Sequence, residues 1–213
     1  MNHLTLPTPP PSSTVLTLAV LASLTIASAS SAQRVIRSFT TSQSFSLTGT
    51  SIAPAGDVDG DGYDDLIVGM PGRDYGGSHN RGLVIVYSGA DGSWITNSPG
   101  SRTGMRLGDS VAHLGDVDGD GFDDFAAGSP YDDAAGNDAG YVRVFSGRTR
   151  AVLWERTGEP LSRFGAALCA VGDLDGDGAP DLAIGRPNNS NTSPYGGVFI
   201  HSGRTGALIT SFV

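Results

Sequence analysis

The sequence predicts an all-β protein built from three four-stranded antiparallel units, arranged as blades of a β-propeller. Three observations carry this prediction: a unit that recurs three times, β-branched and aromatic residues in its apolar segments, and a composition rich in turn residues. The chain has 213 residues, with 31 Gly and 12 Pro, whereas average usage is roughly 7% Gly and 5% Pro. No segment shows a sustained helical period, which argues against a helical bundle.

The recurring unit is clearest around a segment rich in Asp and Gly. It reads GDVDGDGYDDLIVGMP from Gly56, GDVDGDGFDDFAAGSP from Gly115 and GDLDGDGAPDLAIGRP from Gly172. A second apolar segment follows each time: GLVIVYSG from Gly82, GYVRVFSG from Gly140 and GGVFIHSG from Gly196. A two-sheet sandwich would not explain why one loop recurs at one place in every unit, so blades are the better interpretation.

We expect four strands in each unit, called A to D in chain order. Strand A precedes the acidic segment (50–55, 109–114 and 166–171), and strand B is the apolar run after it (66–69, 125–128 and 182–185). Strand C lies in the second apolar segment, and strand D is a short run beyond a turn (93–96, 151–154 and 207–210). The blades are therefore expected at about 48–100, 107–157 and 164–213 within a propeller region spanning 33–213.

The connections between strands divide into two sets. In a meander of this kind the A–B loop and the C–D turn lie at one end of the blade, and the B–C and D–A loops lie at the other. The B–C and D–A loops differ from unit to unit, and variable loops on a rigid scaffold are where binding specificity usually resides. Arg73, Tyr75, Tyr131 and Tyr195 are the candidate contact residues in them.

The first 32 residues are predicted to be a secretory signal peptide. The run from Val15 to Ile26 is apolar but short for a membrane span, and small residues follow it, so cleavage is expected after Ala32 or, failing that, Ala29. The preceding segment has no Lys or Arg, which leaves open a disordered leader with an apolar strand. The mature chain is expected to have no membrane span and to be secreted or held at the cell surface. The single cysteine, Cys169, lies in an apolar run and is expected to be buried and inert.

Charge narrows the classes of partner. Acidic residues number 22 and basic residues 13, for a net charge of −9, and 20 of the acids are Asp while every base is Arg. Nucleic acid is not an expected partner, because there is no basic surplus to neutralise phosphates. Asp belongs in turns and metal-binding loops rather than in helices.

The acidic loops have the spacing of an oxygen-only metal site. Carboxylates at positions 1, 3, 5 and 9 and the main-chain carbonyl at position 7 can converge on one cation, and Gly at positions 4 and 6 permits the tight curl. The number and flexibility of these ligands suit Ca²⁺ better than Mg²⁺, and with no Cys or His present a zinc site is excluded. The predicted ligands for three Ca²⁺ ions are Asp57, Asp59, Asp61, Tyr63 and Asp65; Asp116, Asp118, Asp120, Phe122 and Asp124; and Asp173, Asp175, Asp177, Ala179 and Asp181.

Two other interpretations of the loops fit their residues less well. An EF-hand needs flanking helices and a bidentate Glu at position 12, where this chain has Val68, Ala127 and Ile184. Solvated Asp-Gly turns without an ion would leave four carboxylates repelling one another in each of three loops. Asp64 and Asp123 match no ligand position and are expected to face solvent.

The segment RFGAALCAVGDLDGDGAPDLAIGRP resembles an FG-GAP repeat, as found in the β-propeller of integrin alpha chains. Phe164-Gly165 corresponds to the FG part and Gly185-Arg186-Pro187 to the GAP part. Leu107-Gly108 and Gly128-Ser129-Pro130 correspond to them in the second unit, and Thr48-Gly49 and Gly69-Met70-Pro71 in the first, where the aromatic residue is missing. The resemblance covers roughly residues 35 to 213. It implies calcium in the acidic loops and a ring of the seven-bladed type.

The expected function is that of an exported calcium-binding propeller module that binds a protein or carbohydrate at a cell surface or matrix. The alternatives are an accessory or catalytic part of an extracellular hydrolase or lyase, and a purely structural fragment. No nucleophile elbow, HExxH motif or phosphate-binding loop is present. His201 stands where the other units have the strand residues Tyr87 and Phe145, so it is interpreted as a strand residue rather than a catalytic one. No enzyme activity is therefore expected. Arg34–Phe39 resembles Ala207–Phe212 and is expected to be an extra strand D, so we expect a longer parent protein or self-association.

Overall fold

The computed structural model describes residue 38, residues 45–187 and residues 196–213. The chain divides into two units, Met1–Phe39 and Thr40–Val213, and every described strand belongs to the second. The predicted signal peptide and the candidate contact residue Tyr195 lie outside the described residues, and so does the predicted strand at Arg34–Phe39 apart from Ser38. Within the described residues, no helix has the length and apolar character needed to cross a membrane.

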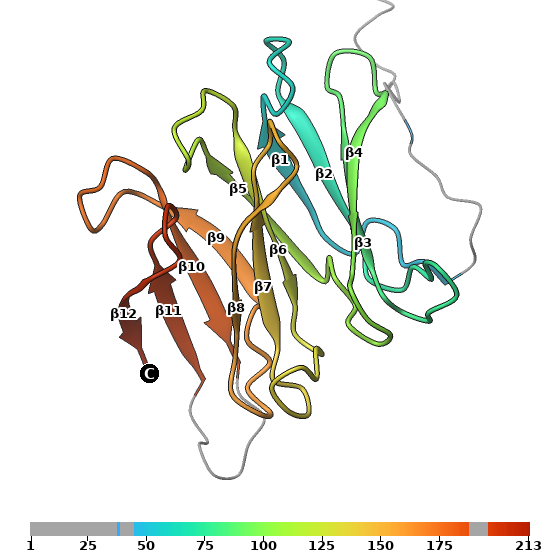
Figure 1. Ribbon diagram of the computed structural model, residues 1–213, viewed down its shortest axis with the longest axis vertical. Coiled ribbons are helices and arrows are strands. Elements are labelled where there is room, and N and C mark those ends of the chain that lie inside the picture. Colours follow the sequence, from blue (N-terminus) through green and yellow to red (C-terminus); the bar gives the residue numbers. More distant parts are fainter. Residues whose placement is uncertain (1–37, 39–44, 188–195) are drawn as a thin grey trace, which may run out of the picture. The chain divides into compact units, whose positions relative to one another are not determined.

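The described part of the second unit contains twelve strands in three four-stranded antiparallel sheets (Figure 1). Blade 1 comprises β1 (Ile52–Gly56), β2 (Asp65–Met70), β3 (Leu83–Tyr87) and β4 (Trp94–Pro99). Blade 2 comprises β5 (Ser110–Gly115), β6 (Asp124–Ser129), β7 (Tyr141–Phe145) and β8 (Val152–Thr157). Blade 3 comprises β9 (Ala167–Val171), β10 (Asp181–Arg186), β11 (Gly197–His201) and β12 (Leu208–Phe212). The predicted all-β fold with three four-stranded blades is confirmed.

Each sheet is a plain meander in which every strand pairs with its neighbours in sequence. The predicted strand positions are correct to within a few residues, and the D strands are longer than expected. For example, β4 continues past its apolar start through Asn97 and Ser98 to Pro99, because its main chain stays paired with the whole of β3. The C and D strands of every blade shift register at the same place, between Val86 and Tyr87 in blade 1. The repeat in the sequence is therefore also a repeat in hydrogen-bonding pattern.

The apolar cores lie between the blades. On β6, Phe125 and Ala127 pack in the cluster shared with blade 1, whereas Ala126 packs in the cluster shared with blade 3. This alternation follows from the two-residue period of a strand, and it explains why β6 reads as a continuous apolar run rather than an alternating one. Phe125 also stacks on Phe145 of β7, with 5.2 Å between ring centroids.

Two small residues set the close approach of neighbouring blades. A Cβ atom on Gly69 would lie 2.1 Å from the Gly108 carbonyl oxygen, and one on Gly128 would lie 2.2 Å from that of Gly165. The same carbonyls accept hydrogen bonds from hydroxyl groups of the preceding blade, at 2.7 Å each: Ser51 donates to Gly108 and Ser110 to Gly165. Glycine and serine in these positions join blade 1 to blade 2 and blade 2 to blade 3 in the same way.

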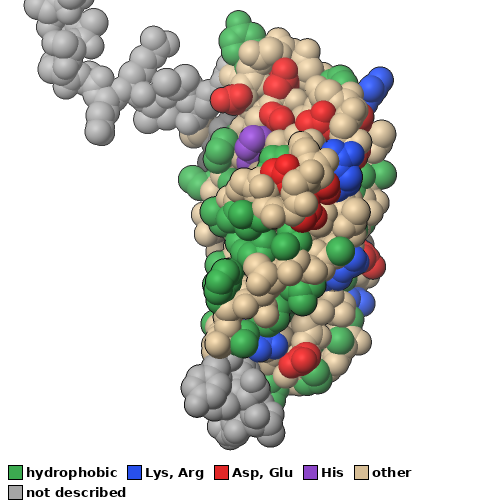
Figure 2. Space-filling model, turned by 90° about the vertical axis from the view of Figure 1, so that its left-hand side faces the viewer, with side chains coloured by type: hydrophobic (Ala, Val, Ile, Leu, Met, Phe, Trp, Pro, Cys, Tyr) green, Lys and Arg blue, Asp and Glu red, His purple; other side chains and the backbone are tan. Residues whose placement is uncertain are grey.

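The outer face of blade 3 is open. Leu168 and Ala170 of β9 pack toward blade 2, so Cys169 between them points the other way and is exposed. The expectation of a buried cysteine is therefore wrong, because the apolar run in which it lies has only one covered face. Figure 2 views the molecule from this side and shows hydrophobic side chains over the middle of the face, with acidic side chains gathered toward its upper end.

Candidate metal centres

The three acidic loops connect strands A and B of their blades and share one main-chain conformation. Gly60 and Gly62 have φ of 80° and 88°, and the glycines at the same positions of the other two loops differ from these by no more than about a degree. This left-handed region is open to glycine at little cost, whereas L-residues rarely adopt it. The glycines thus allow the loops to curl as the sequence predicts.

The first Asp of each loop anchors the curl. Asp57 Oδ1 accepts hydrogen bonds from the amides of Gly60 (2.7 Å) and Asp61 (3.0 Å), and its Oδ2 accepts one from Gly62 (2.9 Å). Asp116 and Asp173 accept the three corresponding bonds in their own loops. A carboxylate has about four lone-pair sites, so each anchor keeps one for a further partner. In loop 3 the pKa of Asp173 is lowered, chiefly by the hydrogen bond from Gly178.

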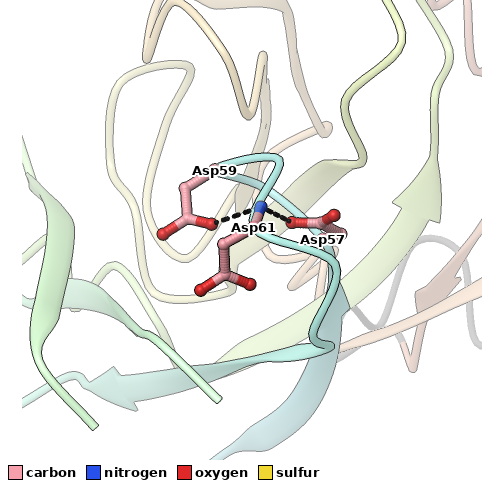
Figure 3. Close-up of side chains that lie close together, drawn as sticks. All are labelled: Asp57, Asp59 and Asp61. Atoms are coloured by element: carbon pink, nitrogen blue, oxygen red, sulfur yellow. Dashed lines mark hydrogen bonds between the residues drawn. The ribbon is translucent and has the colours of Figure 1, made fainter. Parts of the chain in front are cut away.

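Each loop brings three carboxylates together, with the potential ligand atoms of each trio within 4.8 Å of one another. The trios are Asp57, Asp59 and Asp61; Asp116, Asp118 and Asp124; and Asp173, Asp175 and Asp181. Figure 3 shows the first, in which the amide of Asp61 donates to both Asp57 and Asp59. Positions 1 and 3 belong to every trio, and the third member differs: position 5 in the first loop, position 9 in the others.

The other predicted ligands lie in the same loops but outside these trios. They are Asp65 in the first loop, Asp120 in the second and Asp177 in the third, together with the carbonyl-bearing residues Tyr63, Phe122 and Ala179. The Tyr63 side chain is exposed and Ala179 is fully buried, so position 7 has no common side-chain environment. That is compatible with a position predicted to contribute only its main-chain oxygen.

The ninth position has a structural role that the sequence reasoning missed. Asp65 is buried and accepts hydrogen bonds from the amide of Val58 in its own loop and of Gly89 in the C–D turn, both at 3.0 Å. Asp124 and Asp181 make the same two links, to Gly147 and Gly203 respectively. These bonds place the A–B loop and the C–D turn at one end of the blade, as predicted. The sequence feature that indicates this link is the Ser-Gly pair after every strand C, whose glycine amide is the donor each time.

Burial acts on these carboxyl groups. Desolvation raises the pKa of Asp65, and it raises the pKa of Asp124 to about 6, although backbone hydrogen bonds oppose the shift in both. Burial disfavours the negatively charged form of a carboxyl group unless a positive group nearby compensates for the loss of solvation. A cation bound by the same loop would supply that compensation.

The two Asp residues outside the ligand pattern behave differently from each other. Asp64 is exposed, as expected. Asp123 is only partly exposed: its Oδ2 accepts a hydrogen bond from the amide of Asp57 at 3.0 Å and lies 3.4 Å from His113 Nε2. The expectation of a solvent-facing Asp123 is therefore wrong, because blade 1 packs beside it and offers a main-chain donor.

The variable loops lie together at the opposite end of the blades. The D–A loop of one unit bonds to the B–C loop before it, as in the bond from the amide of Arg106 to the Asn80 carbonyl. Tyr75 is exposed beside Arg81. The ring of Tyr131 lies between the guanidinium groups of Arg106 and Arg163, whose central carbon atoms are 4.4 and 5.1 Å from the ring centroid. The predicted grouping of these loops is confirmed, and their role in binding stays a prediction.

The carboxylate trios offer only hard oxygen donors, arranged by short loops at one end of three adjacent blades. Such donors suit divalent cations of the Mg²⁺ and Ca²⁺ type rather than zinc or copper, which favour nitrogen and sulfur ligands. Each loop can therefore hold one hard divalent cation.

Comparison with known proteins finds one matching family model, several curated relatives and similar solved structures. The FG-GAP repeat model matches residues 48–87, 107–145 and 164–206. Curated relatives include integrin alpha-PS2 of Drosophila melanogaster (33% identity over 195 residues) and integrin alpha-5 of Xenopus laevis (35% over 183 residues). These alignments cover 78% and 77% of this chain but only 13% and 17% of the relatives. Among solved structures, the exotype rhamnogalacturonan lyase YesX is similar with a TM-score of 0.47 and 20% identity, over 76% of this chain and 33% of that one.

Proposed function

Since the chain belongs to the FG-GAP repeat family, we propose that it is an extracellular, calcium-binding β-propeller module whose variable loops bind a protein or a carbohydrate. The observation that carries the proposal is the threefold recurrence of one acidic loop, with the same anchoring hydrogen bonds each time. The relatives are much longer proteins than the part this chain matches, so the ligand is inferred for this module alone.

Calcium is the proposed cation because of the donor set. The loops offer carboxylates and main-chain carbonyls on a flexible, glycine-rich frame, and Ca²⁺ accepts six to eight such oxygens in irregular geometry. Mg²⁺ demands a strict octahedron and gives up its water reluctantly. An ion that binds only the folded chain stabilises it by about 2.7 kcal/mol per site at a hundredfold excess over Kd.

Titration calorimetry with Ca²⁺ tests this proposal, with three ions bound per chain as the expected result. Asp118→Asn removes a charge from a trio but keeps an oxygen that can accept the hydrogen bond from Asp120, and it should reduce the stoichiometry to two. Asp64→Asn, a change of the same kind at an exposed position outside the trios, is the matched control and should leave three. A melting temperature that EDTA does not lower would contradict the proposal.

The ligand is proposed to bind at the end that carries the B–C and D–A loops. These loops differ between units while the scaffold beneath them repeats, and Tyr75 and Tyr131 present aromatic rings beside arginines there. Screening a glycan array and a panel of matrix proteins, with Tyr75→Ala as the test variant and Tyr63→Ala at the acidic-loop end as its control, locates the face. Degradation of a bound glycan would instead favour the hydrolase or lyase alternative.

Export is proposed from the apolar leader and its small residues. Mass spectrometry of the protein recovered from the medium of its native host should show an amino terminus after Ala32 or Ala29. Recovery with Met1 intact would contradict export by this route.

A further inference from the structure

A cavity of about 240 Å³ lies between blade 2 and blade 3. Its apolar wall is formed by Phe164, Phe199 and Leu208, and its charged rim by Arg156, Glu159 and Arg186. The cavity is somewhat smaller than the roughly 300–1,000 Å³ of most small-molecule sites. Arg186 lies at the end of β10 that is opposite the third acidic loop, whereas Arg156 and His201 reach the C–D turn at Gly206.

The cavity lies where blade 3 departs from the repeat. In the interface between blades 1 and 2, the buried Met105 packs near Gly100. The residues in these two positions at the next interface are Ser162 and Gly158, and Gly158 lines the cavity. At this interface a buried serine, which donates to the Ala139 carbonyl, stands in place of the methionine, and Phe164 stands in place of Leu107.

The second departure places a positive charge beside that space. Arg186 occupies the position of Met70 and Ser129 in the other blades. Its side chain is only 13% exposed, its guanidinium carbon lies 4.6 Å above the ring centroid of Phe199, and its Nε is buried without a hydrogen-bond partner. Its ion pair is a long one, 3.4 Å from Nη1 to an oxygen of Glu159, whose side chain is 78% exposed. A buried donor without an acceptor is costly, so the contacts of Arg186 within the chain leave its guanidinium group incompletely satisfied.

The other polar groups around the cavity are already engaged. Arg156 donates to the carbonyls of Gly206, Thr205 and Glu155. His201 Nδ1 donates to the Gly206 carbonyl, and burial lowers the pKa of its ring. The cavity is thus lined by two arginines and one carboxylate, that of the exposed Glu159, which makes it locally positive on a chain whose net charge is −9.

We propose that this cavity is a binding site for a small organic carboxylate with a flat apolar body. The carboxylate accepts hydrogen bonds from the Nη groups of Arg186, displacing Glu159 toward solvent, and the body packs against Phe164 and Leu208. Planar guanidinium groups bind carboxylates through two parallel hydrogen bonds, and a ring held over an aromatic wall adds apolar burial. None of the residues that line the cavity is a predicted calcium ligand, and Glu159 lies in the D–A loop that leads from blade 2 to blade 3.

The probe is phenylacetate, with 2-phenylethanol as its neutral counterpart, titrated into the purified ¹⁵N-labelled full chain. The NMR signal of Arg186 Nε–H should shift saturably with phenylacetate and not with the alcohol. Arg186→Met and Ser162→Met each introduce the residue found at that position in another unit. The first removes the donor and the second places a larger side chain beside Gly158, which lines the cavity, so each should weaken binding roughly tenfold or more. Arg148→Met, an exposed arginine beside the second acidic loop, is the matched control and should bind as the unmodified chain does.

Three results would overturn the proposal. They are no saturable shift with phenylacetate, equal affinity for the neutral alcohol, and unchanged affinity in a folded Arg186→Met chain. If Ser162→Met fails to fold, Arg186→Met alone decides, because its side chain replaces a group at the rim rather than filling the interface.

Discussion

At the scale of single residues, the buried Asp at the ninth position of each acidic loop is as much a hydrogen-bonding centre as a candidate ligand. Asp124 accepts bonds from the amides of Val117, Asp118 and Gly147, and it is fully buried. The alanine variant would leave buried amides without acceptors, at about 1–3 kcal/mol for each one not rescued by water.

We therefore expect Asp124→Ala to lower the free energy of unfolding by about 3 kcal/mol or more even in EDTA, where no ion contributes. Urea denaturation in EDTA measures the loss, and the exposed Asp64→Ala should change stability by less than about 0.5 kcal/mol. An Asp124→Ala chain that is destabilised only when calcium is present would show that the residue acts through the ion alone.

A second residue-scale prediction concerns His201, whose ring lies between Trp154 and Phe164, at 6.4 and 5.8 Å between centroids. Burial lowers its pKa below the ordinary value of 6.5, and the charge of Arg156 lowers it further. As the pH falls below about 6.5, the unfolded chain takes up a proton at this residue before the folded chain does. The stability that His201 contributes is therefore complete above that pH and is lost as the pH falls through the folded-state pKa.

The variant His201→Phe places here the residue that blade 2 has at this position. Between pH 7 and pH 5 it should lose less free energy of unfolding than the unmodified chain does. Parallel stability curves for the unmodified and His201→Phe chains would contradict the expectation.

At the scale of the element, a strand in this molecule is specified by its own pattern and by the blade beside it. The positions of all twelve strands could be predicted, because apolar runs, turns and one repeating loop mark them. The role of Asp123 and the exposure of Cys169 could not be predicted, because each depends on whether a neighbouring blade is present. The candidate ligands could be chosen by spacing, but the link from Asp65 to Gly89 joins residues 24 apart, and local spacing does not reveal it.

The close approach of blades gives an element-scale test with a control inside the same chain. Gly128→Ala would put a methyl group 2.2 Å from the Gly165 carbonyl of blade 3, whereas Gly185→Ala meets nothing nearer than the Ala167 side chain of its own blade, at 3.2 Å. Overpacking of this kind costs about 1–3 kcal/mol. Thermal unfolding should show a clear loss for Gly128→Ala and a much smaller one for Gly185→Ala. Equal losses would mean that the glycine serves the strand rather than the contact between blades.

At the scale of the whole molecule, the faces that blades 1 and 3 turn away from blade 2 determine how the chain behaves in solution. Ile52 and Trp94 are exposed on the same face of blade 1 as Val68, and Val198 and Phe212 are exposed on the outer face of blade 3. On blade 2, Val111 and Val142, the counterparts of Ile52 and Val198, are buried. Val152, the counterpart of Trp94, is exposed. Exposed apolar faces of stacked units favour association.

We expect these two faces to associate between copies, blade 3 of one chain against blade 1 of the next, in the arrangement that joins the blades within a chain. Light scattering during size-exclusion chromatography should show a mass that rises with protein concentration. A chain with Trp94→Thr should associate less, because the blade 1 face loses an apolar side chain. A chain with Phe212→Ser should also associate less, because the blade 3 face loses one. Tyr63→Ser, at an exposed aromatic residue in an acidic loop rather than on either face, should not reduce association. A monomer that melts cooperatively at every concentration would show that three blades are stable without a partner and that the open faces are tolerated in water.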